Sequence, residues 1–201
     1  MKPLVYYYCL DLVPNQQASV EASLRELVDL MKRPPLEVDC RIERLPEAAC
    51  QHIPDDLGPR GYLDCFRRIS ATLSEVIGLL PTIDFDRYVI PRLIICCDRQ
   101  HPLAEKCLAG SPGAFWGVAE RHIAAVYELS NRCATWHELL HTLGALDCYD
   151  TKNPQANPGP TCKHPHCIMQ YAPTVGSVDG RLPLCDENII RIRGLFCRLK
   201  N

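Results

Sequence analysis

Residues 135–147, with the sequence TWHELLHTLGALD, constrain this chain more than any other stretch. They place His137, Glu138 and His141 in the pattern HExxH. Residues four apart on a helix lie on one face, one turn apart, so both imidazoles would face a single metal ion. Glu138 lies one residue round the helix from the first ligand, where it suits a general base acting on metal-activated water. The stretch therefore predicts a metal-binding helix.

The pattern continues to Gly144 and Asp147. Because glycine readily adopts the left-handed conformation, we expect the helix to end at Gly144. The turn would return Asp147 to the metal as third ligand, and Asp150 is an alternative for that role. Three protein ligands leave a position for water, which is typical of a catalytic zinc. The alternative is a helix that carries two histidines by chance.

Length and charge narrow the class of protein. A chain of 201 residues is expected to form one domain with a substantial core. Its formal net charge of −2 does not favour nucleic acid or an anionic membrane as a partner. No stretch approaches the roughly 20 apolar residues of a membrane span. The first residues, MKPLVYYYCLDLVP, are expected to form a strand rather than a secretory signal.

The chain has 13 cysteines. An odd number in a chain of this length does not fit a disulfide framework. Buried free thiols behave as small hydrophobic groups. We therefore expect a cytoplasmic protein in which some cysteines bind metal and the rest join the core; a disulfide-rich secreted peptidase is the alternative. Four cysteines lie in apolar runs: Cys9, Cys65, Cys96 and Cys97.

Hydrophobic periodicity predicts an α/β fold. Strand, helix and strand in succession at the start of the chain predict a parallel pair with a right-handed crossover. Pro91 predicts a bulge or an edge position in the third strand. The expected strands are residues 4–12, 36–43, 87–97 and two within 115–129, of which the longer is 123–127; the expected helices are 19–31, 62–80, 132–144 and 186–199.

The whole chain, residues 1–201, is expected to be one catalytic domain. Residues 1–144 would form an upper part with the sheet and the metal helix. Residues 145–201 would form a loop-rich lower part that ends in a helix. We expect that last helix to pack through five apolar residues: Ile189, Ile190, Ile192, Leu195 and Phe196.

A second motif lies in residues 162–171, CKHPHCIMQY, where Cys162, Cys167 and Met169 fit the spacing C-x4-C-x-M. Together with the HExxH helix and the segment FWGVA at 115–119, this motif resembles the archaemetzincins, which are zinc peptidases of the metzincin clan. Their pattern is HExxHxxGxxH, then C-x4-C-x-M, then a late CxxC. The resemblance covers most of the chain in layout and is specific over roughly the last 90 residues.

The resemblance implies a metzincin-like zincin with a twisted, mostly parallel sheet, an antiparallel edge strand, two backing helices, an active-site helix, a Met-turn and a C-terminal helix. It implies that His137 and His141 bind a catalytic zinc, with Glu138 as the base. Met169 would be the methionine of the Met-turn, an apolar floor under the metal. Tyr171 matches the place of a tyrosine that in astacins and serralysins approaches the zinc and can stabilise the oxyanion; the alternative is a tyrosine packed under the turn.

The chain departs from this family at the third ligand. Asp147 stands where the family usually has histidine, although metzincin-like peptidases such as snapalysin use aspartate there. A carboxylate puts more negative charge on the metal and should make its water less acidic than a third histidine would. Cys148 follows directly, as in the family, but an insertion separates it from Cys162. The late CxxC is reduced to Cys185, with Asn188 in place of its second cysteine.

The resemblance also implies a second, structural zinc site, to which Cys167 would belong. Four thiolates would make a closed tetrahedral site, and the best four are Cys148, Cys162, Cys167 and Cys185. His164, His166 and Cys197 are substitutes. The alternatives are free thiols and a disulfide across the insertion.

These observations predict a zinc-dependent peptidase that hydrolyses peptide bonds with metal-bound water and with Glu138 as general base. We expect a monomer whose partner is a peptide or protein substrate, extended by strand addition along the strand at 123–127, which we expect at the edge of the sheet. Trp116 and His122 precede the metal helix and are candidates for the cleft, with surface positions as the alternative. The alternative function is a zinc-stabilised peptide-binding module with little or no turnover.

Overall fold

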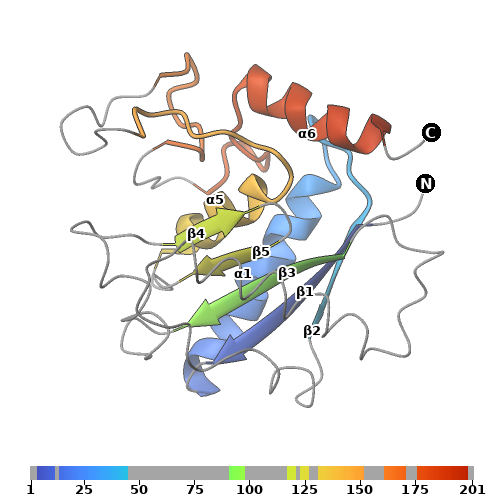
Figure 1. Cartoon of the computed structure of the whole chain (residues 1–201), viewed down its shortest axis with the longest axis vertical. Coiled ribbons are helices and arrows are strands. Elements are labelled where there is room, and N and C mark those ends of the chain that lie inside the picture. The colour runs from blue at the N-terminus through green and yellow to red at the C-terminus, as the bar shows by residue number, and fades with distance from the viewer. Residues whose placement is uncertain are drawn as a thin grey trace.

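The computed structural model describes residues 4–11, 14–44, 91–97, 117–120, 123–126, 131–151, 161–170 and 176–198. These residues form an α/β structure in which a helix lies against one face of a sheet and the C-terminal part lies beyond one end of it (Figure 1). The predicted helix at 62–80 falls outside the described residues, so one of the two expected backing helices is seen.

The sheet has five strands in the order β2-β1-β3-β5-β4. All neighbouring pairs are parallel except β4 with β5, which is antiparallel. The parallel pairing of β1 with β2, predicted from the strand–helix–strand order, is confirmed. The strands are β1 (Leu4–Asp11), β2 (Cys40–Arg44), β3 (Pro91–Cys97), β4 (Gly117–Glu120) and β5 (Ile123–Val126).

Two expectations about the sheet are wrong. The strand at 123–127 was expected at the edge, yet β5 lies inside the sheet and β4 is terminal. Pro91 marks neither an edge strand nor a bulge, because β3 begins at this residue and pairs with β1 and β5. A proline is tolerated as the first residue of a strand, since its missing N–H interrupts the ladder least there.

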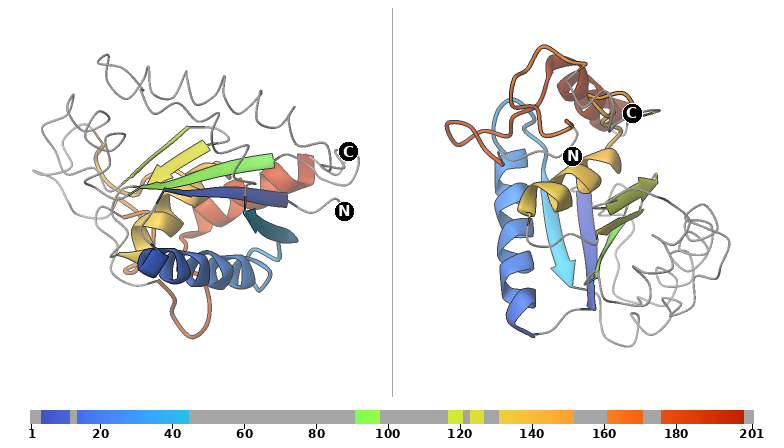
Figure 2. Two further views of the ribbon diagram at one scale, coloured as in Figure 1. Left: turned by 90° about the horizontal axis from the view of Figure 1, so that it is seen from below. Right: turned by 90° about the vertical axis from the view of Figure 1, so that its left-hand side faces the viewer.

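The helix α1 (Pro14–Met31) runs along one face of the sheet (Figure 2). It starts five positions before the expected Ser19, because proline fits the first turn of a helix, where its missing N–H has no partner to lose. The apolar residues that recur with the helical period in this segment are all buried: Val20, Leu24, Leu27, Val28 and Met31.

The return from α1 to β2 differs in part from the predicted strand at 36–43. Burial alternates as expected, with Leu36, Val38 and Cys40 buried and the residues between them exposed. Strand pairing begins only at Cys40. Glu37 has a φ of 53°, and the N–H of Val38 donates to the carbonyl of Met31 at 2.9 Å. Residues 36–39 therefore close the end of α1 before the chain enters the sheet.

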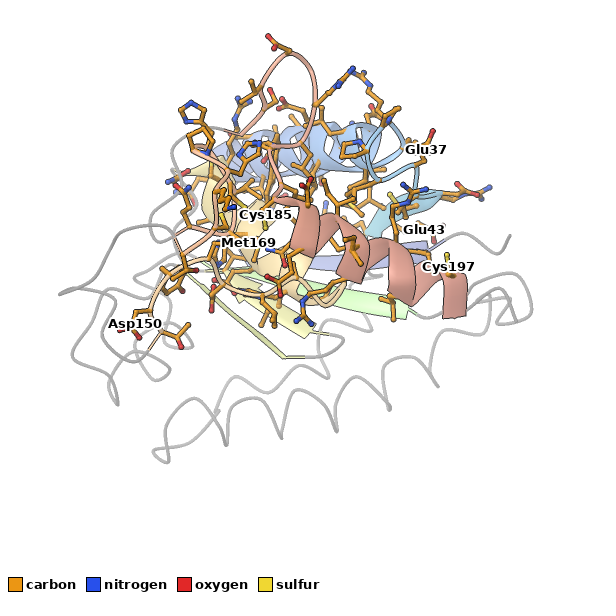
Figure 3. The ribbon with its side chains drawn as sticks, turned by 90° about the horizontal axis from the view of Figure 1, so that it is seen from above. Glu37, Glu43, Asp150, Met169, Cys185 and Cys197 are labelled. Atoms are coloured by element: carbon orange, nitrogen blue, oxygen red, sulfur yellow. The ribbon has the colours of Figure 1, made fainter. Side chains whose placement is uncertain are left out.

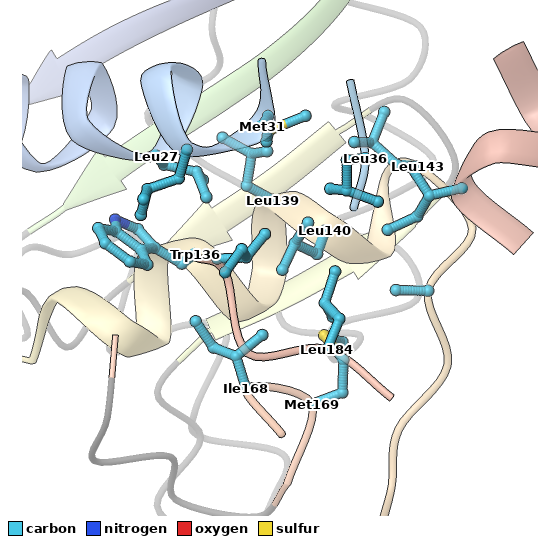
Figure 4. Close-up of a cluster of buried hydrophobic side chains, with 14 of the residues drawn as sticks. Leu27, Met31, Leu36, Trp136, Leu139, Leu140, Leu143, Ile168, Met169 and Leu184 are labelled. Carbon is cyan, nitrogen blue, oxygen red and sulfur yellow. The ribbon is translucent and has the colours of Figure 1, made fainter. Parts of the chain in front are cut away.

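The main core lies between α1 and a second helix, α5 (Arg132–His141), which packs against β4 and β5. Leu27 and Met31 of α1 face Trp136 and Leu139 of α5 (Figure 4). Residues of the lower part complete this core from the other side of α5: Ile168, Met169 and Leu184. The metal helix is thus enclosed by packing on two sides, and its Cys133–Leu140 segment is buried.

The last helix, α6 (Asp186–Arg198), packs through Ile192 and Phe196, with Ile189 and Leu195 partly buried. The prediction for Ile190 is wrong, since this residue is 69% exposed. Positions 189, 192 and 196 share one helical face, and Ile190 is turned away from it. Within the described residues, none of the helices combines the length and apolarity that crossing a membrane requires.

Candidate metal centres

Helix α5 is fixed at its start by a cap and a buried tryptophan. The side chain of Asn131 accepts a hydrogen bond from the N–H of Cys133 at 2.9 Å, which satisfies one of the free donors of the first turn. The indole N–H of Trp136, fully buried, donates to Ser23 of α1, with its hydroxyl oxygen at 2.9 Å. These contacts set the rotation of α5 about its axis and hence the direction of the next residue, His137.

The end of the metal helix is built around Gly144, as the sequence predicts. Gly144 has a φ of 89°, in the left-handed region that favours glycine. Its N–H donates to the carbonyl of His141 at 2.9 Å, and the N–H of Ala145 donates to that of Leu140 at 3.2 Å. This pair of bonds is the Schellman closure of a helix. It reverses the chain and brings residues 145–147 back beneath the last helical turn.

The closure brings together His137, His141 and Asp147, which we call the histidine group. The two imidazole Nε2 atoms are 3.1 Å apart, and each lies 3.1 Å from Oδ1 of Asp147. Three potential ligand atoms therefore form a triangle with nearly equal sides. The His137 side chain is 7% exposed, while His141 and Asp147 are 19% and 23% exposed, so the group is open to solvent on one side.

Both imidazoles are oriented by backbone carbonyls. Nδ1 of His137 lies 2.9 Å from the carbonyl oxygen of Ile168, and Nδ1 of His141 lies 2.8 Å from that of Ala145. A carbonyl only accepts, so each Nδ1 carries the proton and donates it. In the neutral rings both Nε2 atoms then present lone pairs to each other and to a carboxylate oxygen. Such an arrangement is repulsive unless a cation lies among the three atoms.

The size of the triangle fits a metal ion. Ligand atoms about 2.0–2.1 Å from a tetrahedral zinc would be about 3.3–3.4 Å apart, close to the observed 3.1 Å. Two imidazoles and one carboxylate are also a donor set that zinc accepts. Hydrogen bonds from the second nitrogen of each ring to a carbonyl are the usual support of zinc-binding histidines. The residues present therefore fit a zinc ion.

The pKa shifts of Asp147 and His141 also show that the histidine group favours a positive charge. Burial by itself would raise the pKa of Asp147, but the hydrogen bonds with His137 and His141 hold that pKa well below its ordinary value. Burial by itself would lower the pKa of His141, but the hydrogen bond with Asp147 and the charge of Glu138 raise it. The site therefore stabilises a cation beside Asp147.

Glu138 is buried beside the histidine group, with 8% exposure. Burial raises the pKa of its carboxyl, and the electrostatic influence of the neighbouring His137 and His141 only partly opposes this effect. Among the described residues, none donates a hydrogen bond to this carboxylate. A buried carboxylate with a raised pKa is suited to accept and return a proton.

A second set, which we call the cysteine group, consists of Cys148, Cys162, Cys167 and Cys185, with all four sulfur atoms within 4.8 Å of one another. The Sγ atom of Cys148 is 3.8 Å from that of Cys167 and 3.7 Å from that of Cys185. These cysteines are free, so the disulfide across the insertion is not formed. Sulfur atoms about 2.3 Å from a tetrahedral zinc would be about 3.8 Å apart, so the cysteine group also fits zinc.

Burial and crowding keep the thiols of Cys148 and Cys167 from ionising without a cation. Burial and the neighbouring thiols raise the pKa of Cys148 well above its ordinary value. Burial also raises the pKa of Cys167 to about 11, although the N–H groups of Met169 and Cys185 point to its sulfur and oppose the shift. A metal ion would reverse this balance, since a coordinating thiol is deprotonated.

The substitutes proposed for the cysteine group lie outside it. Cys197 is exposed toward the far end of α6 from Cys185 (Figure 3). His166 is exposed, and the backbone N–H of His166 donates a hydrogen bond to Nδ1 of His164 at 3.3 Å. Asp150 is not in the histidine group and lies away from Met169 in the same view. Trp116, His122 and Tyr171 lie outside the described residues.

Met169 is fully buried, and its carbonyl accepts a hydrogen bond from the N–H of Cys148 at 2.7 Å. Its neighbour Ile168 supplies the carbonyl that orients His137. The turn at 167–170 therefore supports the histidine group in two ways: the Ile168 carbonyl orients His137, and buried side chains of the turn pack in the core.

Sequence reasoning missed the contributions of four residues to these sites. The carbonyls of Ala145 and Ile168 orient the histidines, and no side-chain pattern reports a backbone acceptor. The ring of Tyr149 stacks near that of His137, with centroids 6.3 Å apart. The side chain of Asn188 forms hydrogen bonds with the segment between the two groups, and the signal available in the sequence was its place in a CxxC-like motif.

No protein-family model and no curated protein sequence matches this chain.

Proposed function

We propose that this protein is a zinc-dependent peptidase of the metzincin type, similar to the archaemetzincins. The observation that carries the proposal is the triangle of two imidazole lone pairs and one carboxylate oxygen, each 3.1 Å from the others, beside the buried Glu138. Three ligands on an open site with an adjacent base are typical of catalytic rather than structural zinc.

The fold supports the same proposal. The order β2-β1-β3-β5-β4, with β4 antiparallel at one end, has the mostly parallel sheet and antiparallel edge strand that the resemblance implies. Helix α5 packs against β4 and β5, so the histidine group lies on the helix next to that edge. The burial of Met169 supports the proposal that this residue belongs to a Met-turn under the metal.

In this mechanism the chain supplies binding, orientation and proton transfer. His137, His141 and Asp147 would hold the zinc, which supplies Lewis-acid activation of water and of the scissile carbonyl when bound. Glu138 takes the proton released as water attacks the carbonyl. It then passes that proton to the leaving amine. The low dielectric around Glu138 strengthens its interactions with the reacting groups.

We place the substrate along β4 rather than β5. Within the described residues β4 pairs with β5 alone, and the outer edge of a terminal strand is where a further strand can be added. An extended peptide can add there as a further strand, with backbone hydrogen bonds that fix its register. The peptide bond would then be presented beside α5.

The function is tested with Glu138→Ala. We expect this variant to retain zinc, because Glu138 is not a ligand, and to lose cleavage of an unstructured peptide library. The parent should lose the same cleavage when a chelator removes zinc. Cleavage by the variant at the parental rate would refute the mechanism. Absence of chelator-sensitive cleavage by the parent would favour a zinc-stabilised peptide-binding module.

We also propose that the protein works in the cytoplasm, where thiols stay reduced. The seven cysteines whose side chains the structure describes are free. Thiol titration in denaturant after metal removal should find nearly all 13 cysteines of the chain reactive. A count near zero would instead indicate a secreted, disulfide-bonded protein.

A further inference from the structure

Asn188 lies in the first turn of α6 and is 1% exposed. Its Oδ1 accepts a hydrogen bond from the N–H of Leu146 at 2.8 Å, and its Nδ2 donates to the carbonyl of Leu146 at 2.9 Å. One side-chain amide thus satisfies both backbone groups of one residue. Nδ2 also lies 3.5 Å from Sγ of Cys148 and donates to it.

Leu146 stands between the two residues that complete the histidine group. Ala145 supplies the carbonyl that orients His141, and Asp147 supplies the carboxylate. The side chain of Leu146 is 48% exposed, so its own packing holds this segment only weakly. The bidentate amide of Asn188 therefore fixes the backbone between these two contributors.

The third hydrogen bond connects the same amide to the cysteine group. Metal ligands are thiolates, and a donor at a coordinating sulfur orients and tunes it. Cys148 follows Asp147 directly, so Asn188 lies at the point where the two groups adjoin along the chain.

We propose that Asn188 is a positioning residue for both metal groups. It holds Leu146 so that Asp147 and the carbonyl of Ala145 stay in place around His141, and it donates to the Cys148 sulfur. This inference rests on the proposed function in taking both groups as zinc sites, and it deepens that function by naming the residue that couples them.

Two variants separate these contributions from a purely structural role. Asn188→Asp keeps the size of the side chain and the acceptor for the Leu146 N–H, but it places an oxygen against the Leu146 carbonyl and the Cys148 sulfur. Asn188→Ala removes all three hydrogen bonds. The matched control is Ile192→Ala, one turn further along α6, where a fully buried side chain makes packing contacts only.

Zinc affinity is measured by competition with a chromogenic chelator, and the thiolate-to-cobalt absorption band of the cobalt-loaded protein reports the cysteine group separately. We expect both Asn188 variants to bind zinc at the histidine group about 10–100-fold more weakly and to show a weaker thiolate band, as for other residues that support metal ligands. Ile192→Ala should lower the unfolding temperature and leave both metal readouts of the folded protein unchanged.

The proposal is overturned if Asn188→Asp binds zinc at both groups with parental affinity. It is also overturned if Ile192→Ala weakens metal binding in parallel, or if the parent holds no metal at the histidine group. Should Asn188→Ala fail to fold, the isosteric Asp variant decides. A parent that binds two zinc ions but cleaves no peptide would refute the peptidase function alone, because these readouts do not involve turnover.

Discussion

The histidine group and the cysteine group adjoin along the chain but are assembled in opposite ways. His137, His141 and Asp147 come from one helix and the turn that closes it, and two of these side chains are about one-fifth exposed. The cysteine group gathers four separate positions between 148 and 185, and three of its cysteines are buried. A local group with an open side suits a reactive metal, whereas a closed group that joins distant segments suits a structural one.

The two groups also depend on each other unequally. The histidines rely on carbonyls at Ala145 and Ile168, so their geometry depends on segments that the cysteines hold in place. Cys148 follows Asp147 and Cys167 precedes Ile168. Loss of the cysteine group should therefore disturb the histidine group, while loss of the histidine group should leave the cysteine group intact.

The largest expected effect is that of Cys167→Ser. Structural zinc in small domains contributes about 10–16 kcal/mol of binding free energy to folding, so we expect the free energy of unfolding to fall by more than about 4 kcal/mol, an exceptional value for one substitution. The contrasting variant His141→Ala should lose one zinc ion and activity and keep the fold. Zinc content and thermal unfolding check both. Equal destabilisation of the two variants would contradict the division between the groups.

The next effect concerns the third ligand. Asp147→Asn should weaken zinc binding at the histidine group by more than the roughly 10–100-fold that loss of a supporting hydrogen bond costs, and leave the cysteine group loaded. Asp147→His should retain the metal. Because neutral imidazole gives the metal less negative charge than a carboxylate, the activated water becomes more acidic. The acid limb of kcat/KM against pH should then move to lower pH; a shift to higher pH would argue against Asp147 as a ligand.

A smaller effect tests the turn that makes the histidine group local. Gly144→Ala meets nothing within 4 Å, so its cost comes from the positive φ alone, about 1–2 kcal/mol of unfolding free energy. The matched control is Gly194→Ala in α6, which also meets nothing within 4 Å and should stabilise the protein by about 0.5–1 kcal/mol. Urea unfolding measures both. The same sign for the two variants would mean that the closure at Gly144 is not required.

The smallest expected effect is that of removing an exposed ion pair away from both metal groups. Arg132 at the start of α5 pairs with Glu26 of α1 at 2.8 Å, with the two side chains 51% and 41% exposed. Exposed ion pairs contribute about 0–1 kcal/mol. Glu26→Gln should therefore change the unfolding free energy by less than about 1 kcal/mol and alter neither zinc content nor peptide cleavage. A loss of zinc in this variant would show that the helix position is more finely balanced than its core packing indicates.

The two groups also differ in how far the sequence predicts them. Helical period brings His137 and His141 together, and a left-handed glycine returns Asp147 to them, so local rules suffice. The cysteines could be nominated only through the resemblance, because their approach depends on how the segments after α5 pack. Asn188 was noticed only as a missing cysteine, since its hydrogen bonds join positions 42 residues apart in the chain.

The fold shows the same limit. Periodicity identified the buried face of α1 and the parallel pairing of β1 with β2. Periodicity did not show that, in the described sheet, β5 is interior and β4 terminal, because a short apolar strand has the same sequence pattern in either position. Ile190 was misassigned because an apolar residue beside the packing face of a helix looks like a member of it. Neighbour relations between elements arise from packing that no single segment encodes.

Stepwise removal of zinc tests the central claim most directly. The parent is treated with increasing chelator, and zinc per chain and peptide cleavage are measured in the same samples. We expect two zinc ions per chain, with all cleavage lost as the first, from the open histidine group, is removed, while the second and the fold persist. Cleavage that survives removal of the first ion, or a chain that never holds more than one, would contradict the account.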